Sequence, residues 1–331
     1  MRFISVCSGI EAVSCAWTPL GWKAVAFSEI EPFPCQVLKH HFPDVPNMGD
    51  MTKIKGDEYR GAVDILVGGT PCQDFSVAGK RAGLGGERSG LARDFTRLLR
   101  EIRPRWFVWE NVPGVFSTNR GRDFGTLIRT LADIGFGLAW RVLDAQYFGV
   151  PQRRRRVFVV GHLGDWRPAG AVLFEPASLC RDTEARRKKR KDITQSLTGS
   201  LEAGGADDNR AQAGFYVPEI VDQAMSCKWS KGTSGPAGDE HHNLICAPVT
   251  TSCYADNAAQ ESKLIPSRIG VRRLTPLECE RLQSFPDGWT DIPGASDTAR
   301  YKALGNSMCV NVMRWIGERI EREIEGVWYG E

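Results

Sequence analysis

Residues 63–76 read VDILVGGTPCQDFS, an apolar run that ends in a Gly-Gly-Thr-Pro turn directly before Cys72. This arrangement predicts a strand with a cysteine nucleophile at its carboxyl end. A second apolar run, RWFVWENV at 105–112, places Glu110 at the end of another strand. Because strand ends can meet without being adjacent in sequence, we expect this thiol and this carboxyl group to lie together.

Short β-like runs alternate with helix-like segments through the first 160 or so residues. This rhythm predicts an α/β fold with a doubly wound, mostly parallel sheet. Ser8, Glu29 and Asp50 also follow strand-like runs, so we expect them at the same sheet edge, where such folds bind ligands. The strand-like runs are FISVC, AVAFSE, DILVG, WFVWE and VFVVG, and the helix-like segments are EAVSCAW, FPCQVLKHHF, FTRLLREI and DFGTLIRTLADIG.

The pattern changes after residue 163, where long stretches are rich in Gly, Ser, Ala and Asp. We expect a catalytic and cofactor-binding domain at 1–162, a smaller loop-rich domain at 163–290, and a C-terminal segment at 291–331 that returns to the first domain. LTPLECERLQSF at 274–285 predicts a helix with a capping box between Thr275 and Glu278. Apolar spacing in 306–324 predicts the returning helix.

Composition indicates a globular protein, which we expect to be soluble and cytoplasmic. No run approaches the roughly 18 apolar residues that a membrane span needs. The ten cysteines include no C-x-x-C pair, which argues against a zinc ribbon, and no metal site is expected. The net charge of +3 identifies no partner by itself, but basic runs at 152–156 and 186–191 favour phosphate contacts. A solvated basic loop is an equal interpretation of the second run.

Three chemistries would use an activated Cys72. A protease requires a histidine base, but none of the five histidines lies in a recognisable partner motif. A redox thiol requires a resolving cysteine, and none is near in the sequence. Addition to C6 of a pyrimidine requires a thiolate and an acid that protonates N3, and Cys72 with Glu110 fits that requirement.

Five segments, GGTPCQDFS, ENV, QRRRR, RRLTPLECERLQSFP and YKALGNSMCVNV, resemble in this order the motifs of bacterial and phage DNA (cytosine-5)-methyltransferases. The resemblance implies methyl transfer from S-adenosyl-L-methionine to cytosine C5, through a covalent adduct between Cys72 and C6 of a flipped-out base. It implies double-stranded DNA as partner and leaves a cognate restriction endonuclease as a further candidate partner. We expect action as a monomer, because base flipping requires only one active site per cytosine. The resemblance also implies that 163–290 is a target-recognition domain.

The resemblance assigns Arg154 and Arg156 to positioning Glu110 and the flipped cytosine. The Ser8–Gly9 turn is expected to hold the methionine carboxylate through backbone N–H groups, Glu29 the ribose hydroxyls, and Asp50 the adenine amino group, although Asp50 also fits a helix cap. The expected cofactor site comprises Cys7, Ser8, Gly9, Ile10, Glu29, Ile30, Asp50, Met51, Pro71, Asn306 and Ser307. SVCSGIEA departs from the family's F-x-G-x-G-G, having Cys7 for the aromatic residue and Glu11-Ala12 for the glycine pair.

Glycine-rich residues 77–90 carry three basic side chains and predict a mobile loop that closes over DNA, or else a flexible connector. Arg153 and Arg155 are expected to face phosphate or solvent. The expected DNA contacts are Gln73, Ser76, Lys80, Arg81, Arg88, Arg153, Arg155, Thr198, Lys228 and Thr251.

Two alternatives stay open: methylation of a structured RNA cytosine by the same chemistry, and a DNA-binding protein that has lost catalysis through its atypical SVCSGIEA turn. Enzymes that methylate adenine N6 or cytosine N4 are disfavoured, because the chain contains no D/N/S-P-P-Y/F/W motif.

Overall fold

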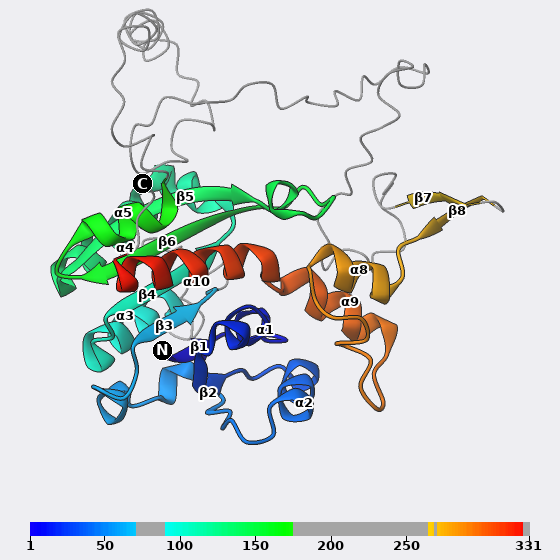
Figure 1. The fold of residues 1–331 in the computed structure, drawn as a ribbon, viewed down its shortest axis with the longest axis horizontal. Coiled ribbons are helices and arrows are strands. Elements are labelled where there is room, and N and C mark those ends of the chain that lie inside the picture. The colour runs from blue at the N-terminus through cyan, green and yellow to red at the C-terminus, as the bar shows by residue number, and fades with distance from the viewer. Residues whose placement is uncertain (71–89, 175–263, 268–269, 327–331) are drawn as a thin grey trace, which may run out of the picture.

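A computed structural model describes residues 1–70, 90–174, 264–267 and 270–326 of the chain (Figure 1). Six strands form the main sheet in the order β2-β1-β3-β4-β6-β5. Their bounds are β1 Arg2–Val6, β2 Lys23–Ser28, β3 Ile65–Gly68, β4 Trp106–Asn111, β5 Phe136–Asp144 and β6 Arg155–Leu163. A separate hairpin pairs β7 (Leu264–Ser267) with β8 (Gly270–Arg273).

The sheet is mostly parallel, as the sequence predicts. The β1–β2, β1–β3 and β3–β4 pairs are parallel, whereas β6 runs antiparallel to both β4 and β5. Strand β5 was not among the five expected runs; its buried residues do not alternate regularly, because its middle is only half-buried. The reversal of β6 has a functional consequence: its first residues, Arg155 and Arg156, lie at the edge where β3 and β4 end.

Helices cover both faces of the sheet (Figure 1). Alternate residues of β4 point to opposite faces, so Trp106 and Val108 join a core with α1, α5 and α10, while Phe107 and Trp109 join a core with α3 and α4. The α-helices are α1 Ala12–Trp17, α2 Pro32–His41, α3 Leu91–Ile102, α4 Arg122–Ile134, α5 Trp166–Leu173, α8 Pro276–Leu282, α9 Asp297–Asn306 and α10 Val310–Glu325. The 3-10 helices are η1 Thr18–Leu20, η2 Met51–Lys53, η3 Gly56–Tyr59, η5 Pro113–Phe116, η6 Thr118–Gly121 and η7 Ala145–Phe148.

The C-terminal helix α10 packs between α1 and α5. The Trp17 indole N–H donates to the Met313 carbonyl over 2.7 Å. Gly317 lets this indole approach, because a Cβ there would lie 2.6 Å from the Trp17 ring. Helix α8 begins with the expected capping box between Thr275 and Glu278.

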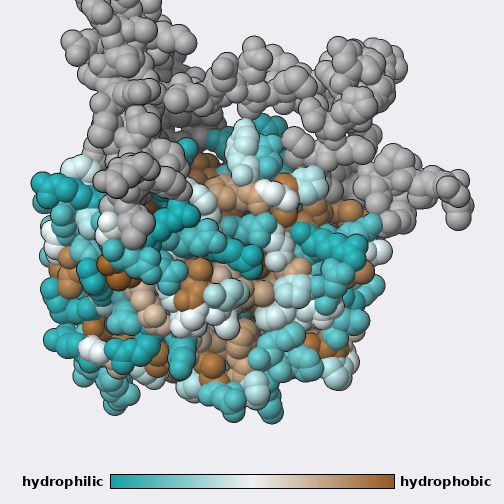
Figure 2. All heavy atoms as spheres, viewed as in Figure 1, coloured by the Kyte–Doolittle hydropathy of each residue, from teal (hydrophilic) through white to brown (hydrophobic). Residues whose placement is uncertain are grey.

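The division into domains stays a prediction, because residues 175–263 lie outside the described part of the chain. Helix α5 packs against β5 and β6, so residues 166–173 lie with the sheet although they follow the expected boundary at 162. Hydrophilic and hydrophobic residues are interspersed on the face shown in Figure 2. Among the described residues, no helix has the length and apolar character that crossing a membrane requires.

Candidate active site

The backbone that leads to Cys72 is fixed by side chains of β4. The Trp109 indole N–H donates to Thr70 Oγ1 over 3.0 Å, and the Asn111 amide donates to the Thr70 carbonyl over 2.8 Å. Thr70 is buried and lies two residues before Cys72, which itself lies outside the described residues. Sequence reasoning singled out Glu110 and missed its two neighbours, although their positions on either side of it in WEN were visible.

Glu110 lies between these two clamping residues and is almost fully buried. Its carboxylate Oε1 is 3.2 Å from Arg156 Nε. Gly69 on the neighbouring chain segment makes room for it, because a Cβ on Gly69 would lie 2.9 Å from Glu110 Oε2. Burial raises the pKa of Glu110, and the nearby Arg156 and Arg154 charges oppose that rise without cancelling it. A carboxyl group with a raised pKa retains a proton more readily near neutral pH, which suits a proton donor.

The two arginines that the sequence pairs together make different contacts. Arg156 forms the ion pair with Glu110, whereas buried Arg154 donates through Nη2 to the carbonyls of Ser307 at 2.7 Å and Gly305 at 3.2 Å. Burial and, to a smaller extent, the charge of Arg156 together lower the pKa of Arg154 to about 9, against the opposing charge of Glu110. Arg154 therefore ties the start of β6 to the end of α9.

Two buried glutamines complete this connection and were not predicted. Gln152 Nε2 donates to the Leu282 carbonyl over 2.6 Å, and Gln283 Nε2 donates to the Leu304 carbonyl over 2.9 Å. The segments around α8 and α9 therefore brace the 152–156 stretch that carries both arginines.

A second polar cluster lies where β1 and β2 end. Glu29 Oε1 accepts from the N–H groups of Ile30 and Glu31 at 2.7 and 2.8 Å, and Glu29 Oε2 accepts from the Gly9 N–H at 2.7 Å. A carboxylate has about four lone-pair directions, so these three hydrogen bonds leave acceptor capacity for a further donor. The Ile30 side chain beside it is 69% exposed.

One expectation for the Ser8–Gly9 turn is wrong. The Ser8 N–H donates to the Ser28 carbonyl over 3.1 Å and the Gly9 N–H to Glu29, so neither is directed to a ligand carboxylate. The side chain of Ile10 is also fully buried in the core, so it presents no surface to a cofactor. These groups instead tie β1 to β2 and orient Glu29.

Asp50 lies at the start of η2, near the end of β2. Its Oδ1 accepts from the N–H and hydroxyl of Thr52 at 3.0 and 2.8 Å, so the helix-cap interpretation holds. These hydrogen bonds, led by the backbone one, lower the pKa of Asp50. Its Oδ2 is paired at 3.7 Å only with the exposed Lys53 Nζ among the described residues, and a carboxylate oxygen has a second lone pair for a further donor. Met51 is buried, with its sulfur 3.6 Å from Cys7 Sγ.

Glu11 marks the departure of this turn from the family pattern. It adopts a left-handed backbone with φ of 64°, and its carboxyl group is fully buried. Glu11 Oε1 accepts from the N–H and hydroxyl of Ser14, both at 3.0 Å, while Oε2 has no hydrogen-bond partner among the described residues. Burial raises the pKa of Glu11 to about 7. Near neutral pH a large fraction of this carboxyl group is therefore protonated, which lowers the cost of burying it.

Ser307 is buried and gives its carbonyl to Arg154, while Asn306 is exposed at the end of α9. Arg153 is exposed and Arg155 half-buried, and their DNA contacts stay predictions. Within the described part of the chain, no three His, Cys, Asp or Glu side chains are grouped to bind a metal. The expected residues that lie outside the described part are Pro71, Cys72, Gln73, Ser76, Lys80, Arg81, Arg88, Thr198, Lys228 and Thr251.

An α/β sheet with these two polar clusters at one edge is typical of a transferase that binds a cofactor containing a nucleoside. Residues 1–322 match the family described as C-5 cytosine-specific DNA methylase. The chain belongs to this family, whose members are DNA cytosine-5 methyltransferases that use S-adenosyl-L-methionine.

Individual relatives match nearly the whole of this chain, but their names describe different methyltransferases. The DNA N-6-adenine-methyltransferase of Escherichia phage P1 is 32% identical over 97% of this chain, which spans 61% of that relative's length. Type II methyltransferase M2.BsuMI of Bacillus subtilis (strain 168) is 29% identical over 97% of this chain, and the match covers 76% of that relative's length. The crystal structure of S. pombe Dnmt2 superposes with a TM-score of 0.63 at 17% identity, covering 97% of this chain and 98% of that chain, and shows the shared fold.

Proposed function

We propose that this chain methylates C5 of cytosine at a specific sequence of double-stranded DNA, with Cys72 as the covalent nucleophile. The observation that carries the proposal is the buried Glu110–Arg156 pair beside the clamped Gly69–Thr70 backbone that leads to Cys72. These contacts support the proposal, because Glu110 has a raised pKa and lies beside the backbone segment that precedes Cys72 in the sequence.

The chemistry follows from these two groups. The Cys72 thiolate forms a bond to C6 while Glu110 gives its proton to N3, which makes C5 nucleophilic. S-adenosyl-L-methionine would supply the electrophilic methyl group, which C5 takes as the sulfonium S–CH₃ bond breaks and S-adenosylhomocysteine leaves. Loss of the C5 proton to a base then breaks the S–C6 bond, and the N3 proton returns to Glu110. Because these atoms are hidden in a duplex, the cytosine must leave the stack.

The described residues fit a nucleoside cofactor. Glu29 has an anchored carboxylate for the ribose hydroxyls, Asp50 Oδ2 is available to an amino group, and the exposed Ile30 side chain offers an apolar surface beside them. The backbone around these groups would be shaped by Cys7, Ser8, Gly9 and Met51. The opposite side of the site would be formed by Asn306 and Ser307.

The name of the phage P1 relative raises a second candidate, methylation of adenine N6. Two observations favour cytosine C5 instead. The chain contains no D/N/S-P-P-Y/F/W sequence, and it spans only 61% of that relative, so the named activity need not belong to the shared part. The type II name of M2.BsuMI supports proposing a cognate restriction endonuclease as partner. We propose that the chain acts as a cytoplasmic monomer, because one flipped cytosine requires one active site.

Methylation sequencing of genomic DNA from a methylase-free host that expresses this chain tests the proposal. We expect C5-methylcytosine in one recurring sequence context, and none with Cys72→Ser. N6-methyladenine would favour the second candidate. Unmethylated DNA with methylated cytosine in cellular RNA would move the substrate to RNA, and no modification from folded protein would favour a binding protein.

A further inference from the structure

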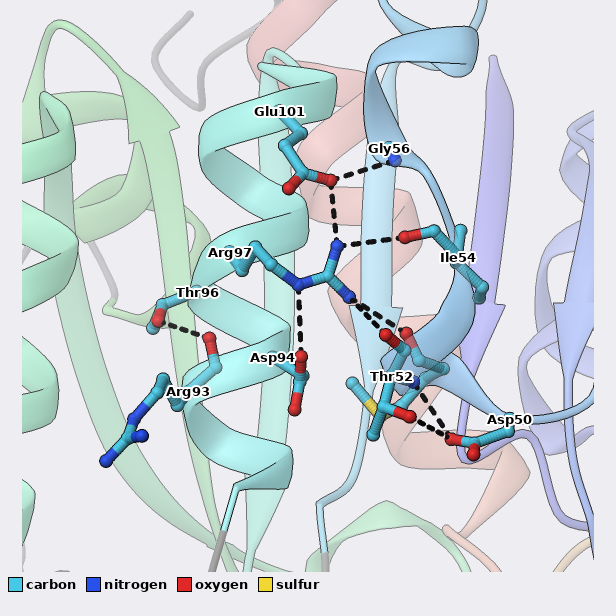
Figure 3. Close-up of polar contacts among 10 residues, drawn as sticks. Asp50, Thr52, Ile54, Gly56, Arg93, Asp94, Thr96, Arg97 and Glu101 are labelled. Carbon is cyan, nitrogen blue, oxygen red and sulfur yellow. Dashed lines mark hydrogen bonds and ion pairs between the residues drawn. The ribbon is translucent and has the colours of Figure 1, made fainter.

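The turn that carries Asp50 is fastened to α3 by one guanidinium group, that of Arg97 (Figure 3). Arg97 Nη2 donates to the carbonyls of Met51 at 3.1 Å and Thr52 at 3.3 Å, and Nη1 donates to the carbonyl of Ile54 at 2.9 Å. These are carbonyls at the carboxyl end of η2 and its cap, where a cation is favourable.

The guanidinium is itself held in a fixed plane. Asp94 and Glu101 lie one turn before and one turn after Arg97 on α3, with Asp94 Oδ1 at 3.0 Å from Nε and Glu101 Oε2 at 2.9 Å from Nη1. Glu101 Oε2 also accepts from the Gly56 N–H over 2.9 Å. Gly56 is needed there, because a Cβ would lie 2.8 Å from the Glu101 Cβ. A planar fork can satisfy carbonyl and carboxylate acceptors together, and an ammonium group cannot reproduce this arrangement.

Arg97 and Asp50 act on opposite ends of the same short helix. Asp50 caps the N-terminus of η2 through Thr52, and three residues of 3-10 helix span only about 6 Å. The position of Asp50 Oδ2 therefore depends on where Arg97 holds the other end. Without Arg97, three carbonyls lose a donor and the turn loses its attachment to α3.

We propose that Arg97 is a positioning residue for selection of the cofactor's adenine base: it fixes η2 so that Asp50 Oδ2 accepts the exocyclic amino group. The inference rests on the proposed function, because it requires an adenine nucleoside at this edge. If so, a residue on α3 contributes to the choice of cofactor. Helix α3 is the first described helix after the segment with Cys72.

Calorimetric titration of the full chain with S-adenosylhomocysteine and with S-inosylhomocysteine tests this role, because hypoxanthine presents an oxygen where adenine presents the amino group. We expect the parent protein to prefer the adenine ligand by about tenfold or more. Arg97→Met should reduce that preference to roughly threefold or less, while affinity for a DNA duplex is retained. Arg93→Met is the matched control, because Arg93 lies one turn earlier on α3, exposed and directed away from η2 (Figure 3), and it should keep the full preference.

The ratio of the affinities for S-adenosylhomocysteine and S-inosylhomocysteine distinguishes a positioning role of Arg97 from a general structural effect. Equal weakening of both ligands by Arg97→Met, or an unchanged ratio, would overturn the inference. Thermal melting checks folding, and Arg97→Lys serves if the methionine variant does not fold: a ratio below that of the parent supports the role, and the parent ratio refutes it. If the parent protein binds neither ligand, the proposed function fails instead.

Discussion

At the end of β2, the Glu29 carboxylate accepts N–H groups that lie at most 20 residues away along the chain. At the start of β6, Arg154 reaches carbonyls that lie 151 and 153 residues away, and Gln152 reaches one 130 residues away. The two clusters share one sheet edge but are assembled differently. The Glu29 carboxylate of the cofactor cluster is held by neighbouring turns, whereas Gln152 and Arg154 of the catalytic cluster require the C-terminal segment to be in place.

The difference implies that the two functions can be separated by mutation. Local turns of the cofactor cluster form with little loop-closure entropy, whereas the catalytic cluster depends on contacts that close long loops. Loss of a brace between 152–156 and α8 or α9 should therefore impair chemistry while cofactor binding remains. Loss of a contact around Glu29 should weaken cofactor binding while the rate of methylation at saturating cofactor remains.

The largest effect should come from Glu110→Gln, which removes the proposed proton donor of the catalytic cluster. We expect the rate of methylation at saturating cofactor to fall by about 10²–10⁴-fold. Affinity for S-adenosylhomocysteine should stay within roughly twofold, because Glu29 and its contacts are unchanged. Single-turnover kinetics measures the first quantity and calorimetry the second, with the exposed Glu58→Gln as control. A near-parent rate of adduct formation would refute the role of Glu110.

The next largest effect concerns pH and the buried Glu11 of the cofactor cluster. Burial raises the pKa of this carboxyl group from 4.5 to about 7, so the folded protein binds the proton more tightly than the unfolded chain does. Its contribution is full below pH 4.5 and is lost as pH rises through about 7. The free energy of unfolding should therefore fall by about 3 kcal/mol over this range relative to Glu11→Gln. Urea denaturation at several pH values measures the difference.

The Glu11 result also tests its surroundings. Ser5 and Ser14 hydrogen-bond this carboxyl group and lower its pKa, and the Glu29 charge raises it. Identical pH profiles for the parent and Glu11→Gln would show that the pKa of Glu11 is the same in the folded protein and in the unfolded chain, and would refute the shift.

A smaller effect is expected from Glu29→Gln, which replaces one acceptor oxygen by an NH₂ group facing N–H donors. Affinity for S-adenosylhomocysteine should fall by about 10–100-fold, because a charged acceptor of several hydrogen bonds is lost. The rate of methylation at saturating cofactor should change little. A rate that falls as far as the affinity would show that the two clusters are coupled.

The sequence predicted the parts of this site that depend on strand ends. Glu29 and Glu110 lie where the apolar runs placed them, and the Thr275–Glu278 capping box was visible from residue spacing. The reversal of β6 was not visible, because an apolar run carries no sign of strand direction. Other features depend on which segments pack together, and the sequence alone does not reveal that. They are the distinct contacts of Arg154 and Arg156, the hydrogen bonds that hold Thr70, and the attachment of η2 by Arg97. The position of Cys72 stays a prediction.

The smallest expected effect, that of Gln152→Met, tests most directly whether the two clusters are independent. Gln152→Met retains the volume of a buried side chain but removes its donor to the Leu282 carbonyl, so the free energy of unfolding should fall by about 1–2 kcal/mol. Because Gln152 lies two residues before Arg154, the methylation rate should also fall severalfold, while the dissociation constant of S-adenosylhomocysteine stays at the parent value. The exposed Gln36→Met on α2 is the control for a surface change of the same type. Weakened cofactor binding without a loss of rate would contradict the division, because a brace from the C-terminal segment would then act on the cluster that local turns assemble.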